Sequence, residues 1–352
     1  MQSSQVSASD FVHLVKPHHP NFWHKVGVVF CSFNIVESED PLKSAFGIMF
    51  HHFHGENHPA GQGSISADEL DQMLVWLRKD YKILNIEEFF QKALAGKLTT
   101  KETCLTLDDS LLCQYEIALP VIESHGLTAL FNVYSSAHSD KPDPLEIYRY
   151  FRSVSYESFD EFFVEFFTMI KERFSSDYLK GMSRFSREKE IYDEFPFYTE
   201  NDKLFRFFRD KILGPSNYNL IMIDLMNQKM FDTSEVPKKV FMTVSQLAQL
   251  NRKGHTLGLH SDSHPTQIQS LSKEEQVREY TTNYGFLKNI TGTGARIVAH
   301  PCGQYSETTL EILNQLEVVV GFRSSLNIPF AKSLLEIPRE DHSNLLKNLV
   351  RE

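Results

Sequence analysis

Residues 255–265 read HTLGLHSDSHP, an apolar run that ends in two histidines four positions apart, His260 and His264. Gly254 precedes the run and follows a helical stretch, and glycine readily takes the left-handed conformation that ends helices. The stretch therefore predicts a strand that ends at the first of the two imidazoles, with the second just beyond it. In a helical turn this spacing places two histidines on one face, where they can bind one metal ion. Two polar loop histidines would show the same spacing, so a metal site also needs a carboxylate from elsewhere.

Short apolar runs alternate with amphipathic stretches along much of the chain, a pattern typical of βα architecture. The predicted strands are residues 47–52, 103–108, 127–133, 255–260, 296–301 and 318–323. Capping boxes predict three helix starts, at Ser66 with Glu69, Thr243 with Gln246, and Ser272 with Glu275.

The sequence LTLDDS at residues 105–110 runs an apolar strand directly into two acids, Asp108 and Asp109. Neighbouring residues at a strand end point to different sides, so one acid can bind a metal while the other faces the reacting water. The alternative is a turn or a helix N-cap, for which Asp-Asp-Ser is equally suited. A third stretch, VAHPCGQ at 298–304, can aim a backbone N–H into a cavity as an oxyanion donor, or be merely a turn.

Taken in chain order, the three stretches resemble the NodB-homology domain of polysaccharide deacetylases, carbohydrate esterase family four. The resemblance covers most of the chain apart from one inserted segment. The resemblance implies a distorted (β/α) barrel of about seven strands with the site at the carboxyl ends of the strands. It also implies that Asp109, His260 and His264 hold a divalent metal, with zinc expected, and that Asp108 is the general base.

The resemblance assigns further residues by position. The backbone N–H of Cys302 would help to hold the oxyanion, and His342 is the candidate acid for the leaving nitrogen, although a surface histidine is the alternative. His51, His300 and Arg339 are the predicted substrate-binding residues.

The chain departs from the family in two motifs, and in the third motif Cys302 stands where a tyrosine usually follows the proline. Ala299 stands where an arginine often orients the base, so Arg339 is the candidate replacement. Ser110 stands where glycine is commonest, a change that a negative φ would tolerate. Nearby, His51, His52, His54 and His58 suggest a second metal site, but one cleft-lining histidine with surface neighbours is the favoured interpretation.

Composition limits the classes of partner. The chain has 352 residues, 41% hydrophobic, and a net charge of −10 without a basic run, so nucleic acid is not an expected partner. Its four cysteines lie far apart, which indicates reduced thiols. The N-terminal stretch lacks the basic start and apolar core of a signal peptide, and no run is long enough to span a membrane, so we expect a cytoplasmic protein.

The chain is expected to form one catalytic domain over residues 1–352, with an aromatic-rich, largely helical insertion at 139–239. Within the insertion, Ser158 with Glu161 predicts a capped helix that is aromatic along one face. Packing of this helix onto the barrel is favoured over a lid or a subunit interface through which the chain would form a homo-oligomer. The insertion would lie beside the catalytic face and influence substrate choice.

The expected function is metal-dependent deacetylation of an N-acetylated sugar, a precursor in surface-glycan synthesis. A sugar deformylase, an O-deacetylase or a hydrolase of a non-sugar amide could use the same metal site. A catalytically silent glycan-binding module is the alternative from another class.

Overall fold

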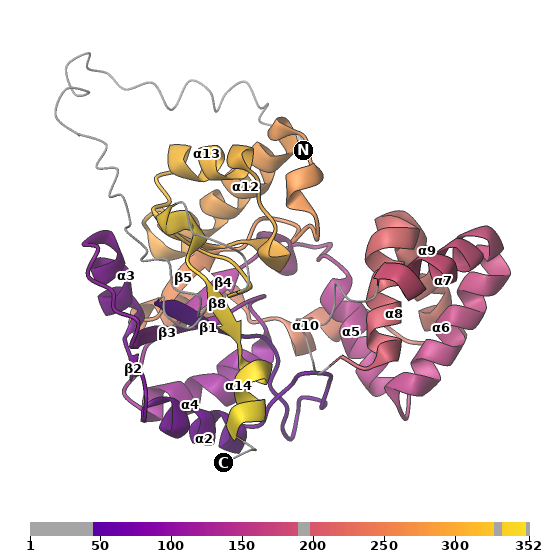
Figure 1. Cartoon of the computed structure of the whole chain (residues 1–352), viewed down its shortest axis with the longest axis horizontal. Coiled ribbons are helices and arrows are strands. Elements are labelled where there is room, and N and C mark those ends of the chain that lie inside the picture. The colour runs from indigo at the N-terminus through magenta and orange to yellow at the C-terminus, as the bar shows by residue number, and fades with distance from the viewer. Residues whose placement is uncertain (1–44, 189–197, 327–332, 350–352) are drawn as a thin grey trace, which may run out of the picture. The chain divides into compact units, whose positions relative to one another are not determined.

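Parallel strands form the central sheet of the computed structural model, which describes residues 45–188, 198–326 and 333–349. The strands are β1 (Phe46–Phe50), β2 (Lys82–Ile83), β3 (Glu102–Leu107), β4 (Leu130–Val133), β5 (Thr256–Leu259), β6 (Ile297–Ala299), β7 (Val320–Phe322) and β8 (Arg339–Asp341). Seven of them follow the order β7-β6-β5-β4-β3-β1-β8, and β2 pairs with β3. A parallel bridge from Phe322 to Ile337 links the two ends of this order, so the sheet nearly closes (Figure 1). The predicted distorted barrel of about seven strands is confirmed.

All six apolar runs contain a strand, as predicted. The sequence did not predict β2 or β8, because neither strand contains an apolar run. β2 has only two residues, and β8 reads Arg-Glu-Asp, which carries three charges. Arg339 and Asp341 of β8 are nevertheless buried.

Helices connect the strands and cover the sheet (Figure 1). Their bounds are α2 (Ala67–Leu77), α3 (Ile86–Leu94), α4 (Leu119–Ser124), α5 (Leu145–Val154), α6 (Phe159–Arg173), α7 (Ser175–Glu188), α8 (Glu200–Phe207), α9 (Gly214–Gln228), α10 (Val236–Val240), α11 (Val244–Arg252), α12 (Lys273–Thr291), α13 (Glu307–Gln315) and α14 (His342–Leu349). The three predicted capping boxes are present in α2, α11 and α12. Among the described residues, no helix is long and apolar enough to cross a membrane.

The helical segment between β4 and β5 has its own hydrophobic core. Helices α6–α9 gather into a group (Figure 1), and the aromatic face of α6 packs on the other helices of this group. Phe162 and Phe166, for example, lie 5.5 and 5.0 Å from Phe205 of α8, measured between ring centroids. The expectation that α6 packs onto the barrel is therefore wrong, because its apolar face is covered within the segment itself.

The capping box predicted for α6 is half present. The Ser158 side chain accepts a hydrogen bond from the Glu161 backbone N–H, as expected. The Glu161 carboxylate, however, accepts from the backbone N–H of Glu157.

Gly258 in β5 allows a close approach between neighbouring strands. A Cβ at this position would lie 2.4 Å from Oδ1 of Asn132 on β4. Only glycine fits beside this buried amide without displacing it.

Candidate active site

Most of the predicted site residues meet because they follow the carboxyl ends of strands, whereas Arg339 is the first residue of β8. His51 follows β1, the pair Asp108 and Asp109 follows β3, His260 follows β5, and His342 follows β8. In a parallel barrel these ends share one face, where enzyme sites are commonly built.

Asp109, His260 and His264 form the one group among the described residues whose side chains could hold a metal ion, with their candidate ligand atoms within 4.8 Å of one another. Asp109 Oδ1 lies 3.4 Å from Nε2 of His260 and 3.4 Å from Nε2 of His264. The segment joining the histidines is a loop instead of a helical turn, with left-handed backbone at Ser261 and His264. Its path brings the two imidazole rings to 4.8 Å.

Neighbouring groups fix the orientation of this cluster. Nδ1 of His260 donates to the carbonyl oxygen of Ala299 at 2.8 Å, which turns Nε2 toward Asp109. The Glu279 carboxylate on α12 accepts hydrogen bonds from the backbone N–H groups of Asp262 and Ser263, and from the Ser263 hydroxyl. The loop between the two histidines is thereby tied to a helix.

The cluster has the properties expected of a metal site. Asp109 Oδ1 is buried and accepts no hydrogen bond, an arrangement that is costly unless a cation is bound. Burial would raise the pKa of Asp109, but the nearby charges of His264 and His260 hold it well below its usual range. Two imidazoles and one carboxylate, with positions left for water and substrate, suit zinc. The residues present therefore fit the divalent metal that the sequence predicts.

The backbone at Ser110 differs from the expected conformation. Its φ is 51°, and that of Asp109 is 78°, so both residues lie in the left-handed region. We expected serine to replace glycine here without cost if φ were negative. The positive φ shows that this condition is not met. The turn that presents Asp109 therefore carries backbone strain at two non-glycine residues.

Asp108 is buried beside the cluster and is held by two partners. Both of its oxygens accept from the Arg339 guanidinium, at 2.8 and 2.7 Å, and Oδ1 also accepts from the Asn132 amide at 2.7 Å. Burial alone would raise the pKa of Asp108, but Arg339 and His260 hold it well below its usual range. Asp108 is thus ionised at neutral pH.

Arg339 has the contacts of the base-orienting residue proposed from the sequence. It is 1% exposed, and its remaining donors bind the Thr106 hydroxyl and the carbonyl oxygen of Arg323. Arg339 also lines the cavity, and its predicted contact with substrate stays a prediction.

His342 lies in the site and not on the surface, which removes the surface alternative. It is 3% exposed, with Nε2 2.9 Å from the carbonyl oxygen of Gly63 and Nδ1 3.2 Å from that of Met49. His51 lies at the rim, with Nε2 3.9 Å from Asp108 Oδ2.

His300 and Cys302 follow β6, where a left-handed φ of 51° at Cys302 marks a tight turn. His300 is completely buried, stacks on Tyr305 and bonds the carbonyl oxygen of Leu335 through Nε2. Burial lowers the pKa of His300 to about 4, so the ring is neutral. The predicted functions of both residues, substrate binding and an oxyanion N–H, stay predictions.

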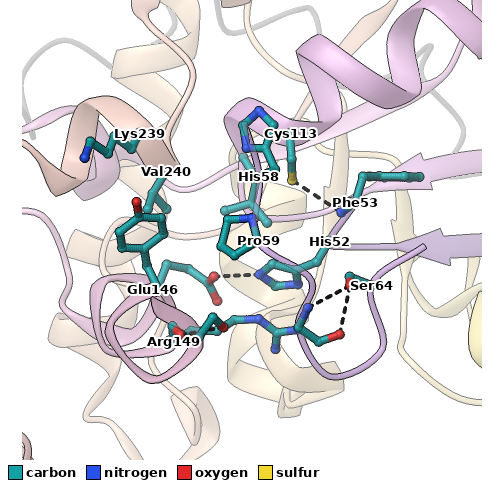
Figure 2. Close-up of a pocket in the computed structure, with 14 residues that line it drawn as sticks. His52, Phe53, His58, Pro59, Ser64, Cys113, Glu146, Arg149, Lys239 and Val240 are labelled. Carbon is teal, nitrogen blue, oxygen red and sulfur yellow. Dashed lines mark hydrogen bonds and ion pairs between the residues drawn. The ribbon is translucent and has the colours of Figure 1, made fainter. Parts of the chain in front are cut away.

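The other N-terminal histidines bind side chains. His52 pairs with Glu146 at 2.7 Å (Figure 2), His58 pairs with Glu116 at 2.7 Å, and His54 contacts the Ser64 hydroxyl. Their separate partners favour a single metal site. His52 nevertheless lines the cavity together with His51, and His58 is buried, so the expectation of one cleft-lining histidine with surface neighbours is wrong.

A cavity of about 450 Å³ opens over the cluster, a size suited to a small ligand. It is lined by residues at the strand ends, including Asp108, Asp109, His260, His264 and His342. Residues of α5 and α8 complete its wall, so the helical segment does reach the catalytic face.

Sequence reasoning missed Asn132 and Glu279. Asn132 lies within an apolar strand, and Glu279 lies in the middle of an amphipathic helix, so neither stands out in a motif. A polar residue inside the predicted strand 127–133 was the one available signal, because a buried amide requires a partner.

A parallel barrel with a buried His-His-Asp cluster at its strand ends is an enzyme-like arrangement. The family model for polysaccharide deacetylases matches residues 227–321, which include the histidine motif and the turn after β6. The resemblance to this family is thus confirmed in sequence over that range. The acid pair Asp108 and Asp109 lies before the matched range.

Solved structures confirm the fold. IcaB from Ammonifex degensii is 15% identical, with a TM-score of 0.52 over 88% of this chain and 98% of its own. A de-N-acetylase from Aggregatibacter actinomycetemcomitans is 13% identical, with a TM-score of 0.51 over 87% of this chain and 99% of its own. No match to this chain was found among curated protein sequences.

Proposed function

We propose that the protein is a metal-dependent hydrolase that removes an acetyl group from the nitrogen of an acylated sugar. The observation that carries the proposal is the pairing of two differently held carboxylates. Asp109 faces two imidazoles with a free buried oxygen, while Asp108 is kept ionised by Arg339. One carboxylate thus suits a metal and the other a proton.

The residues would divide the chemistry as follows. A divalent ion held by Asp109, His260 and His264 would polarise the acyl carbonyl and acidify a water molecule. Asp108 would accept the proton of the attacking water, because it is ionised and fixed by Arg339 and Asn132. Its fixed geometry reduces the entropy lost on reaching the transition state.

His342 is proposed to protonate the leaving nitrogen. Its Nδ1 and Nε2 lie 3.2 and 2.9 Å from the carbonyl oxygens of Met49 and Gly63, which only accept hydrogen bonds and so hold the ring in the site. An N–H of this ring would give its proton to the substrate nitrogen. The backbone N–H of Cys302 is proposed as an oxyanion donor.

The choice of an acetyl group and of a sugar as the substrate is based on the similarity to deacetylases. A formyl group, an O-acetyl group or a non-sugar amide would meet the same cluster, so a substrate panel must separate them. The expected cytoplasmic location stays a prediction. The preference for a glycan precursor over a finished polymer depends on that location.

The test is acetate release from a panel of N-acetylated sugars by purified protein reconstituted with zinc. We expect release to stop after chelation and in Asp108→Asn, and to persist in Asp232→Asn, a matched change on an exposed loop. Formate release from N-formylated sugars, without acetate release, would show that the enzyme is a sugar deformylase instead. Stoichiometric zinc with sugar binding but no acyl release would support the silent binding module instead.

A further inference from the structure

One wall of the catalytic cavity is strongly cationic and comes from the helical segment. It is lined by Arg149 and Arg152 of α5, Arg206 of α8, and Arg209 and Lys211 of the π-helical segment Phe208–Leu213 that follows α8. The proposed deacetylation does not use these residues, because an acetamide carries no charge.

Some of these cations are already neutralised by carboxylates. Arg209 binds Asp210 through two hydrogen bonds, at 2.6 and 2.9 Å. Two further carboxylates that line the cavity have partners too, since Glu146 of α5 binds His52 and Asp341 of β8 accepts from the Ser343 backbone N–H.

Arg152 and Arg206 have no ion pair with any residue in the described part of the chain. The Nε atom of each is buried and lacks a hydrogen-bond partner. Burial lowers the pKa of Arg152 to about 10, which still leaves it charged at neutral pH. Both side chains are partly buried, and a guanidinium whose Nε is shielded from water without a partner is costly, so a bound anion would stabilise them.

Aromatic rings hold both guanidinium groups in place. Arg152 lies 4.8 Å from the ring centre of Phe205, and Arg206 lies 4.0 Å from that of Tyr198. Contact with a ring face leaves the N–H edge of a guanidinium available to an anion in its plane. The cations are thus oriented before any ligand arrives.

The cationic wall is tied to the catalytic loops. Gln267, three residues after His264, donates to the carbonyl oxygen of Asp210 at 3.4 Å. The pair of Glu146 with His52 joins α5 to the end of β1, and Figure 2 shows Arg149 beside this pair. A ligand over the metal cluster would therefore lie within the same cavity as the arginines.

Resting on the proposed function, we propose that Arg149, Arg152 and Arg206 bind the phosphate or pyrophosphate group of an acylated sugar whose amide lies over the metal cluster. Phosphate oxygens accept several hydrogen bonds in different directions, which suits guanidinium groups from two helices. The substrate class is thus a sugar linked through phosphate to a nucleotide or a polyprenyl lipid, not a neutral polymer.

Binding and turnover are measured separately. N-acetylglucosamine 1-phosphate, UDP-N-acetylglucosamine, a short polyprenyl-diphosphate N-acetylglucosamine and neutral N-acetylglucosamine oligomers are titrated into the full-length protein, with zinc and with a chelator. We expect phosphorylated ligands to bind in both conditions, because the arginines need no metal. The tighter of the nucleotide and lipid forms identifies the source of the phosphate.

The variants are the double change R152M/R206M, the charge-retaining R206K, and R184M as a matched control. Arg184 also lies over a phenylalanine ring but pairs with Glu188 and does not line the cavity. We expect R152M/R206M to bind phosphorylated ligands about 10- to 100-fold more weakly, with R184M unchanged and R206K intermediate. Melting temperatures exclude unfolding as the cause.

The outcomes separate this inference from the proposed function. Acetate release with no preference for phosphorylated sugars, or equal binding by R152M/R206M, would overturn the phosphate site and leave the deacetylase intact. Arginine-dependent binding of phosphorylated sugars without acyl release would support the site and overturn the proposed hydrolysis.

Discussion

Arg339 lies at the end of the sheet order on β8, yet its guanidinium binds both oxygens of Asp108 after β3, at 2.8 and 2.7 Å. The strand between them, β1, pairs with both β3 and β8. Arg339 thus reaches across one strand to set the charge of the predicted base.

Replacing Arg339 with methionine is expected to shift the pH dependence of activity. Without the guanidinium, burial raises the pKa of Asp108, so the base is protonated over more of the acidic range. The acidic limb of kcat/KM therefore moves to higher pH, and kcat falls about 100-fold or more. Pre-steady-state or steady-state acetate assays across pH measure both effects.

The control is Arg296→Met, because Arg296 contacts the Phe90 ring and does not line the cavity. It should leave the profile unchanged. A normal acidic limb in Arg339→Met would show that Arg339 does not set the ionisation of Asp108.

The site residues that a sequence pattern predicted each follow an apolar run that forms a strand. Asp108, Asp109 and His260 end such runs, and parallel strands bring their ends together. A strand without an apolar run is not predicted, although a functional residue within it can still be identified. Arg339 was proposed from its position, but β8 was not, since its three residues are all charged.

Residues that act through long-range contacts were out of reach. Asn132 and Glu279 gain their significance from partners that are distant in sequence, and single polar residues in strands and helices carry no spacing pattern. The arginines of the cavity wall were hidden for the same reason. The packing of α6 was mispredicted because an aromatic face does not reveal which neighbour covers it.

Changing Glu279 to glutamine is expected to weaken zinc binding by about tenfold or more. The carboxylate accepts three hydrogen bonds from Asp262 and Ser263, in the loop that presents His264. The amide retains fewer acceptor sites, so the loop loses its tie to α12. Competition with a fluorescent chelator measures the affinity.

Glu274→Gln is the matched control, because Glu274 is exposed in the first turn of the same helix. Equal zinc affinity in both variants would mean that the loop keeps its conformation without Glu279.

Gly258→Ala is expected to lower the free energy of unfolding by about 1–3 kcal/mol and to reduce kcat. The new methyl group would lie 2.4 Å from Oδ1 of Asn132, so the amide that holds Asp108 must move. Adding Asn132→Ala should recover only part of the stability, because Leu130 Cδ1 would still lie 2.9 Å from the new methyl group, and it should not recover activity. Chemical denaturation and acetate release measure the two effects.

Gly285→Ala serves as the control, since Gly285 lies in α12 with no atom within 4 Å of its added Cβ. It should stabilise the protein by about 0.5–1 kcal/mol. A stable, fully active Gly258→Ala would contradict the close approach between β4 and β5.

His342→Gln is expected to affect substrates according to their leaving groups. An amide nitrogen must be protonated to depart, whereas the nitrophenolate of 4-nitrophenyl acetate leaves without a proton. The variant should therefore lose about 100-fold in kcat on an N-acetylated sugar and only a few-fold on the ester. Asp108→Asn should lose activity on both, because the attacking water needs the base in each case. Equal losses on both substrates in His342→Gln, with zinc bound normally, would show that His342 supports the loop at Gly63 and does not act as the acid.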